Sequence, residues 1–203
     1  MFGLKPPQSI FVHGDGFFKA AISMNKNPSD SGFDPFCFAA LVTNSAFASE
    51  LYLKCLIHLE SGQLIKDEHN LHKLFQKLSE KTQQEIEGPF NAELAKAATY
   101  DLSQASEQSK RVISSRPKTL REALKVGGKA FVEWRYLYEY GETGHFGLFP
   151  LPAILRNTIL SRKPDWANFG FKLQRIGGVL PTSLAQKTPA QAAPADPKVD
   201  GNQ

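Results

Sequence analysis

Two charged residues inside a long apolar segment are the first candidates for chemistry. Residues 44 to 59, NSAFASELYLKCLIHL, contain Glu50 and Lys54 as their only Asp, Glu, Lys or Arg residues, four positions apart. On a helix this spacing brings both side chains to one face, with the acid toward the N-terminus, which is the favourable order for an ion pair. So apolar a helix should be mostly buried, and a buried charge needs partners.

The pair has two interpretations that the sequence leaves open. In the first, Glu50 and Lys54 lie on a narrow exposed strip and satisfy each other. In the second, they line a polar cleft together with Arg135 and Glu139, which are also four residues apart, and with the neighbouring Tyr136. Because an Arg among aromatic side chains can bind phosphate and stack on bases, the second interpretation predicts a site for RNA or a nucleotide. The same aromatic residues would also suit the edge of a core.

His69 is the third candidate, at the expected start of a helix. A histidine there can form a hydrogen bond at the helix end or move protons. His69 and His72 have the spacing of a metal-binding pair, but the sequence offers no evident third ligand. We therefore predict no metal site, and nothing else in the chain indicates a cofactor.

A basic run occupies residues 110 to 129. Seven Lys and Arg residues against one acid, Glu122, give this run a net charge of +6. Such a run can neutralise phosphates and make binding salt-dependent, although a solvated face is the commoner meaning. The residues predicted to attract phosphate are Lys110, Arg111, Arg116, Lys118, Arg121 and Lys125.

The elements that must position these residues are all helices. Apolar residues follow helical spacing, and no alternating strand pattern of useful length is present. We predict an all-α fold, an up-and-down bundle of four to five helices with short peripheral helices. The expected helices are residues 15 to 24, 36 to 60, 70 to 80, 89 to 105, 120 to 138 and 152 to 160.

Glycine and proline set two of these boundaries and interrupt one of the helices. Gly62 should end the second helix, and Pro89 suits the first position of the fourth. Gly127 and Gly128 interrupt the apolar stripe of the fifth helix at a cost of about 1 kcal/mol each, so they mark either a kink or a close helix crossing. We favour the close crossing.

The 203-residue chain is long enough for one domain and a tail. We assign residues 1 to 168 to the helical domain and 169 to 203 to a C-terminal extension, expected to be disordered from about residue 181 because it is rich in Ala, Pro, Gln and Lys. Cys37 and Cys55, on one helix, would be about 27 Å apart and unable to pair.

The cellular setting follows from what the chain lacks. The first ten residues, MFGLKPPQSI, do not have the basic and apolar regions of a secretory signal, and no stretch approaches the roughly 18 apolar residues of a membrane span. We expect a cytoplasmic protein with no membrane association. A pI near 9.0 and a net charge of +4 suit a nucleic-acid partner without requiring one.

Three motifs, in this order, resemble the HEPN superfamily of small helical-bundle proteins, which accompany nucleotidyltransferases, toxin systems and anti-phage defence in prokaryotes. They are NSAFASELYLKCL, HNLHKLFQKL and FVEWRYLYE, and the resemblance covers about residues 36 to 140. It implies a bundle of four or five helices, commonly a homodimer, with a polar cleft. In the family the second motif often begins His-Asp-Leu, where this chain has His69, Asn70 and Leu71.

The catalytic signature of the superfamily is not carried over. Many members resemble metal-independent RNases with an Arg followed by a His after four to six residues. None of the seven Arg residues here has a His at that distance, and the nearest approach, Arg135 with His145, has nine residues between. The resemblance therefore implies the fold and the cleft, and whether the chain is an enzyme stays open, with the signature against it.

Three hypotheses follow. The first is a binding protein for RNA or a nucleotide, with a cleft formed by Glu50, Lys54, His69, Arg135, Tyr136 and Glu139. The second is an interaction module that docks a separate nucleotidyltransferase or defence effector. The third is a metal-independent RNase with a non-standard site, in which Glu50 is the base, His69 the acid and Arg135 the anion stabiliser.

Overall fold

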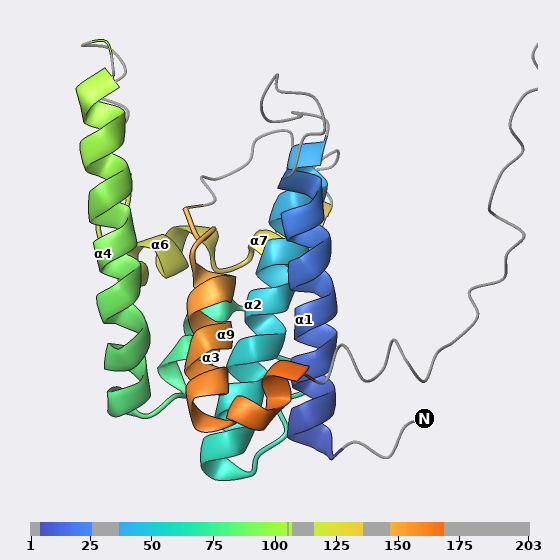
Figure 1. Ribbon diagram of the computed structural model, residues 1–203. Helices are drawn as coiled ribbons and strands as arrows, with labels where there is room; N and C mark the ends of the chain where they lie inside the picture. Colours follow the sequence, from blue (N-terminus) through green and yellow to red (C-terminus); the bar gives the residue numbers. More distant parts are fainter. Residues whose placement is uncertain (1–4, 26–36, 105, 107–115, 136–146, 169–203) are drawn as a thin grey trace, which may run out of the picture. The chain divides into compact units, whose positions relative to one another are not determined.

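The computed structural model describes residues 5–25, 37–104, 106, 116–135 and 147–168, all within one compact unit, Met1–Gly170. The described residues form helices and no strand, which confirms the all-α prediction. The expected disorder beyond residue 181 falls outside the described residues. The helices are α1 (Pro6–Asn25), α2 (Phe38–Ser61), α3 (Leu71–Gln76), α4 (Glu80–Gln104), α6 (Leu120–Gly127), α7 (Ala130–Arg135), α9 (Leu151–Arg162) and the 3₁₀ helix η2 (Pro164–Asn168) (Figure 1).

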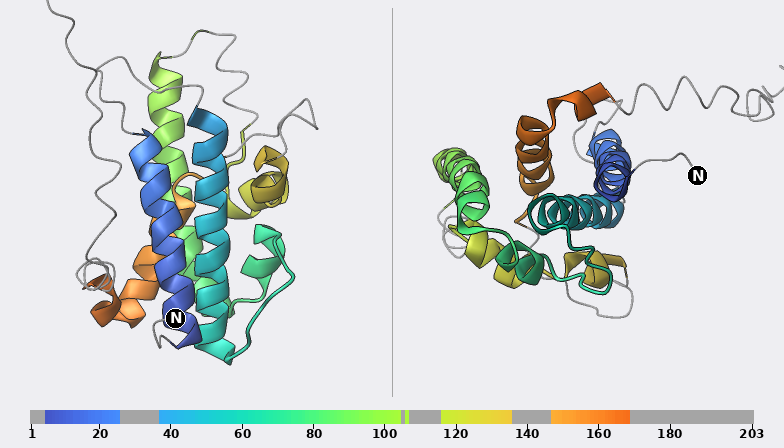
Figure 2. Two further views of the ribbon diagram at one scale, coloured as in Figure 1. Left: turned by 90° about the vertical axis from the view of Figure 1, so that its right-hand side faces the viewer. Right: turned by 90° about the horizontal axis from the view of Figure 1, so that it is seen from below.

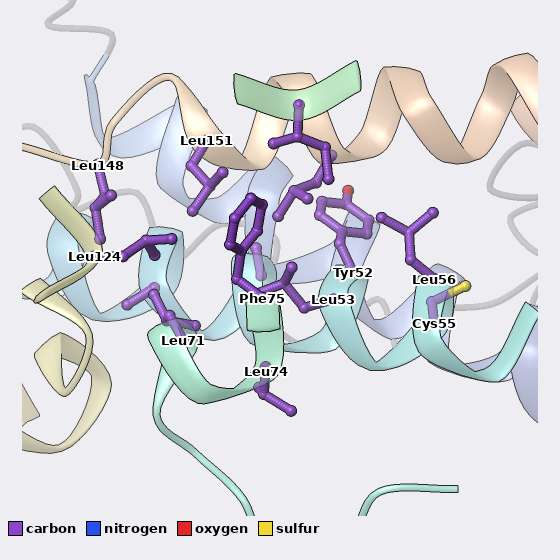
Figure 3. Close-up of a cluster of buried hydrophobic side chains, with 14 of the residues drawn as sticks. Tyr52, Leu53, Cys55, Leu56, Leu71, Leu74, Phe75, Leu124, Leu148 and Leu151 are labelled. Carbon is purple, nitrogen blue, oxygen red and sulfur yellow. The ribbon is translucent and has the colours of Figure 1, made fainter. Parts of the chain in front are cut away.

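The central helix is α2, which packs against α1, α3, α7 and α9 (Figure 2). It agrees with the expected helix at residues 36 to 60, and Gly62 ends it as predicted, at φ 71°. The core gathers leucines and aromatic residues from α2, α3, α6 and the start of α9 (Figure 3). The side chains that meet there include Tyr52, Leu53, Leu56, Leu71, Leu74, Phe75, Leu124, Leu148 and Leu151.

The first helix begins nine residues before the predicted start at residue 15. Pro6 and Pro7 are compatible with a first helical turn, where a missing N–H costs nothing. Gly14 has a low intrinsic helix propensity, yet its lack of a side chain lets α1 approach α2. A Cβ on Gly14 would lie 2.9 Å from Tyr52 Cε1. The packing between helices therefore outweighs the low helix propensity of glycine.

A buried polar network holds α1 on α2 and α9. The Tyr52 hydroxyl donates to Asp15 Oδ1 at 2.6 Å, and Arg156 donates to both Asp15 oxygens at 2.8 and 3.2 Å. Burial, together with the hydrogen bond to Asp15, raises the pKa of Tyr52 far above its ordinary range. The three helices are thus joined by one carboxylate.

Cys37 and Cys55 form no disulfide with each other, as predicted. Cys37 is half-buried just before α2, whereas Cys55 is fully buried and its thiol donates to the Pro7 carbonyl at 3.3 Å. Burial raises the pKa of the Cys55 thiol to about 12. Cys55 therefore behaves as a small core residue beneath α1.

The predicted start of the fourth helix at Pro89 was wrong. The helix α4 begins at Glu80, just after Ser79, whose hydroxyl accepts from the Thr82 N–H at 3.4 Å, and Pro89 lies inside it. Burial of Ile86 and Phe90 on either side of the proline offsets the lost hydrogen bond, which costs about 3 kcal/mol in an exposed helix. Tertiary packing thus overrides the proline signal.

A second polar network lies at the C-terminal end of α2. The Glu60 carboxylate accepts hydrogen bonds from the Ser79 N–H at 2.9 Å, from Thr82, and from Arg162 at 3.1 Å. Burial opposes ionisation of Glu60, but the bonds from Thr82, Ser79 and Arg162 outweigh it and lower its pKa. Arg162 also donates to Glu85 at 2.7 Å, so α2, α4 and α9 are joined.

The single helix expected at residues 120 to 138 is divided into α6 and α7. The division lies at Gly128, where the chain also meets the start of α3. A Cβ on Gly128 would lie 2.5 Å from the Leu124 carbonyl oxygen and 3.1 Å from Asn70 Oδ1. The Leu71 N–H donates to the Gly128 carbonyl at 2.8 Å. The predicted close approach at the glycines is therefore present, and the helix is interrupted at the same point.

The remaining predicted helices are present with shifted ends. The third helix ends at Gln76 rather than residue 80, because Lys77 and Leu78 close its last turn with 3₁₀-type bonds. The last helix extends from Leu151 to Arg162, slightly beyond both predicted ends. None of the helices within the described residues has the length and apolar character needed to cross a membrane.

Candidate functional site

The Glu50 and Lys54 side chains are buried on α2, so the exposed-strip interpretation was wrong. Glu50 is 1% exposed and Lys54 is 8% exposed. Lys54 Nζ donates to Glu50 Oε1 at 2.8 Å, as the four-residue spacing predicted. The pair forms a closed ion pair inside the fold rather than a surface one.

The pair anchors the connection between α2 and α3. Lys54 Nζ also donates to the Lys66 carbonyl at 3.3 Å, and His69 Nδ1 lies 3.0 Å from the same Glu50 oxygen. Both contacts reach out of α2 to residues 63 to 70, which have no helical structure. One buried carboxylate therefore fixes the position of a loop histidine.

The contact assigns the ring nitrogens of His69. An ionised carboxylate only accepts hydrogen bonds, so Nδ1 carries the hydrogen and donates to Glu50. The other nitrogen, Nε2, has no hydrogen-bond partner among the described residues, and the His69 side chain is 51% exposed. A carboxylate–imidazole pair with one nitrogen held and the other open can bind an anion, accept a donor or transfer a proton.

The residues next to His69 hold the backbone around it. The Asn70 side chain caps α3 by accepting from the Lys73 N–H at 3.1 Å, and Glu68 accepts from the Asn70 N–H at 2.9 Å. The bond from Asn70 and the nearby Lys73 lower the pKa of Glu68, against a smaller opposing effect of burial. His69 is therefore held on both sides.

An aromatic pair borders the exposed imidazole. Phe131 of α7 lies with its ring centre 6.4 Å from that of His69, and it stacks on Phe47 of α2 at 4.5 Å with an interplanar angle of 18°. Phe131 is half-buried. The site thus combines a polar group with an apolar wall, as ligand sites usually do.

The second oxygen of the buried carboxylate is not engaged in the same way. Glu50 Oε2 has no hydrogen-bond partner in the part of the chain that the structure describes. A buried carboxylate oxygen of this kind requires a donor from water, a ligand or another side chain. Glu50 therefore acts through His69 and through whatever donor reaches Oε2, not by contacting solvent directly.

The other residues predicted for the cleft are less fully placed. Arg135 is the last residue of α7, a helix that packs on α2, but its side chain is not described. Tyr136 and Glu139 lie outside the described residues. The structure thus brings together three of the six cleft residues, Glu50, Lys54 and His69.

The predicted phosphate-attracting residues divide into three groups. Lys118 and Lys125 are exposed, as is Arg116. Arg121 is engaged with Glu87, donates to Gln83 at 2.9 Å, and lies 5.8 Å from the Phe75 ring centre. Lys110 and Arg111 lie outside the described residues.

Sequence reasoning missed two features of the site. It did not assign Glu68 or the Lys66 carbonyl, which orient the loop, because no spacing rule connects a loop to a helix eleven or more residues earlier. It also did not predict that Phe47 and Phe131 meet. The helix-capping signal of Asn70 before Leu71 would have fixed the end of this loop.

Comparisons of the chain with protein families, curated proteins and solved structures found no match. Among the described residues, no group of three His, Cys, Asp or Glu side chains is arranged to hold a metal ion.

Proposed function

We propose that this chain is a HEPN-like helical-bundle protein that binds RNA or a nucleotide at the surface around His69. One observation carries the proposal: a fully buried carboxylate, Glu50, holds a half-exposed imidazole by one nitrogen and leaves the other open. The resemblance of the motifs supports a role in prokaryotic defence or toxin systems. It also supports assembly as a homodimer, which is common in that superfamily.

The cost of burying the pair argues for a role beyond stability. Removing a carboxylate and an ammonium from water costs several kcal/mol each, and replacing such pairs by apolar residues is often neutral or stabilising. The Glu50–Lys54 pair is therefore an inefficient way to stabilise α2. The effect specific to this pair is that Glu50 holds His69 in one orientation, and an exposed imidazole held in this way suits ligand recognition.

The chemistry of His69 fits a nucleic-acid ligand. In its neutral form Nε2 accepts a hydrogen bond from a ribose hydroxyl or a base, and in its protonated form it donates to phosphate. Its ring can also stack on an unpaired base, as aromatic side chains do in RNA recognition. Lys125 on α6 and Lys118, just before the N-cap of that helix, add exposed positive charge.

Binding of a labelled RNA pool in EDTA tests the proposal. We expect His69→Ala to weaken binding about tenfold, since loss of one base-stacking side chain costs about 1–3 kcal/mol. His72→Ala is the matched control, because His72 lies three residues further along and contacts Gln76 rather than Glu50. Absence of RNA and nucleotide binding in the wild-type protein would overturn the proposal.

Metal-independent RNA cleavage is a second candidate, favoured by the 3.0 Å contact between Glu50 and His69. A carboxylate that orients an imidazole is a common arrangement for general acid–base catalysis. Nε2 would accept the proton of a ribose 2′-hydroxyl as that oxygen attacks the adjacent phosphorus. The bond from phosphorus to the 5′-oxygen of the next nucleotide then breaks, leaving a 2′,3′-cyclic phosphate, and the departing 5′-oxygen takes a proton from water. Fragmentation of the RNA pool in EDTA, lost in His69→Ala and kept in His72→Ala, would support it; intact RNA would exclude it.

A further inference from the structure

The start of α3 and the break between α6 and α7 form a junction next to His69. The Leu71 N–H donates to the Gly128 carbonyl at 2.8 Å, and a Cβ on Gly128 would lie 3.4 Å from the backbone nitrogen of His72. The residue after Gly128 is Lys129, and the residue two before Leu71 is His69. The backbone contact therefore brings a lysine and the exposed histidine to the same small region.

Two lysines at this junction carry exposed charge. Lys125 and Lys129 are four residues apart on either side of Gly127 and Gly128, and both are exposed. Gly128 keeps right-handed helical angles, φ −65° and ψ −20°, so the chain does not reverse its direction at the glycine between the two lysines. The two exposed charges therefore flank the junction, and Lys129 directly follows the residue whose carbonyl accepts from the Leu71 N–H.

These two lysines differ from their basic neighbours in what they contact. Arg121 is paired with Glu87, and Lys73 lies 3.7 Å from Glu68. Among the described residues, neither Lys125 nor Lys129 has an ion-pair partner. The nearest acid along α6, Glu122, accepts a hydrogen bond from the Lys118 N–H at 2.8 Å.

We propose that a single strand of RNA crosses this junction, with one base against the His69 ring and the adjoining phosphates at Lys129 and Lys125. The inference rests on the proposed function and specifies its substrate class and path. A single strand is favoured because the exposed ring needs the face of an unpaired base, which a duplex hides within its stack. The two lysines then follow the backbone without reading sequence.

The salt dependence of binding tests the path. For single strands, log K falls with log salt, and each lost phosphate contact makes this negative slope shallower by roughly 0.7. We expect the double variant Lys125→Gln/Lys129→Gln to reduce the magnitude of this slope by about 1.4 for a labelled single-stranded RNA in EDTA. The matched control is Lys5→Gln/Lys19→Gln, which removes the same charge from exposed positions at the start of α1 and along it.

The outcomes separate this inference from the proposed function. RNA binding with an unchanged slope in Lys125→Gln/Lys129→Gln, or with an equal change in the control, would overturn the path and leave the His69 site standing. Equal competition by duplex RNA would overturn the single-strand class. Absence of any binding by the wild-type protein would overturn both proposals together.

Discussion

At the scale of single residues, the molecule depends on which partners a buried charge finds. The spacing of Glu50 and Lys54 was enough to predict their ion pair, because four residues on a helix fix their relative positions. The bond from His69 to Glu50 was not predictable in the same way. It joins residues 19 positions apart through a loop whose path depends on the Lys66 carbonyl and the Asn70 cap.

Substitutions of the buried pair separate its structural role from its functional one. Glu50→Ala leaves the Lys54 ammonium buried without its partner, so we expect a loss of about 3–5 kcal/mol in the free energy of unfolding, measured by urea denaturation. The double variant Glu50→Leu/Lys54→Leu should be much less destabilised, because no charge stays buried.

RNA binding by the double variant decides what the pair is for. We expect it to fall toward the level of His69→Ala, since the imidazole has lost its anchor. Binding equal to that of the wild-type protein would show that the pair serves the fold alone.

At the scale of helices, the sequence predicted best where apolar spacing and a strong terminator agree. The helix α2 satisfied both, with its apolar run and Gly62. The starts of α1 and α4 were misplaced, the second because Pro89 was interpreted from its local preference alone. Contact with Tyr52 gives Gly14 its role, and burial of Ile86 and Phe90 carries α4 through Pro89.

Two glycines, one at the junction between α3 and α6 and one within α1, should respond to alanine substitution with opposite changes in stability. Gly128→Ala places a methyl group against the Leu124 carbonyl and Asn70, and we expect it to destabilise the protein by about 1–3 kcal/mol. Gly16→Ala, within α1, meets nothing within 4 Å and should stabilise it by about 0.5–1 kcal/mol. Urea denaturation of both variants checks this; stabilisation by Gly128→Ala would contradict the close packing of the junction.

At the scale of the whole molecule, two carboxylates join separate helices: Asp15 links α1, α2 and α9, and Glu60 links α2, α4 and α9. Composition and spacing could predict an all-α domain, because apolar periodicity marks helices. They could not predict these links, since each depends on side chains brought together from distant positions by the packing of the helices.

The Glu60 network predicts acid sensitivity. The pKa of Glu60 is lower in the folded protein than in the unfolded chain, so its contribution is present above the unfolded pKa and is lost as the pH falls through the folded pKa. We expect the wild-type protein to lose more stability than Glu60→Gln as the pH falls below about 5, measured by urea denaturation at several pH values. Parallel losses in both proteins would remove Glu60 as a source of acid sensitivity.

The buried Cys55 thiol has a consequence for observing the molecule. Its sulfur is covered by the start of α1, and the thiol donates a hydrogen bond to the Pro7 carbonyl. Burial raises the pKa of this thiol, which keeps it protonated and unreactive while the helices are packed. Only detachment of α1 or a larger opening exposes it to an alkylating reagent. The rate at which Cys55 is alkylated, separated from that of the half-buried Cys37 by peptide mapping, therefore measures how often the packing over this sulfur opens, in a chain that needs no added label.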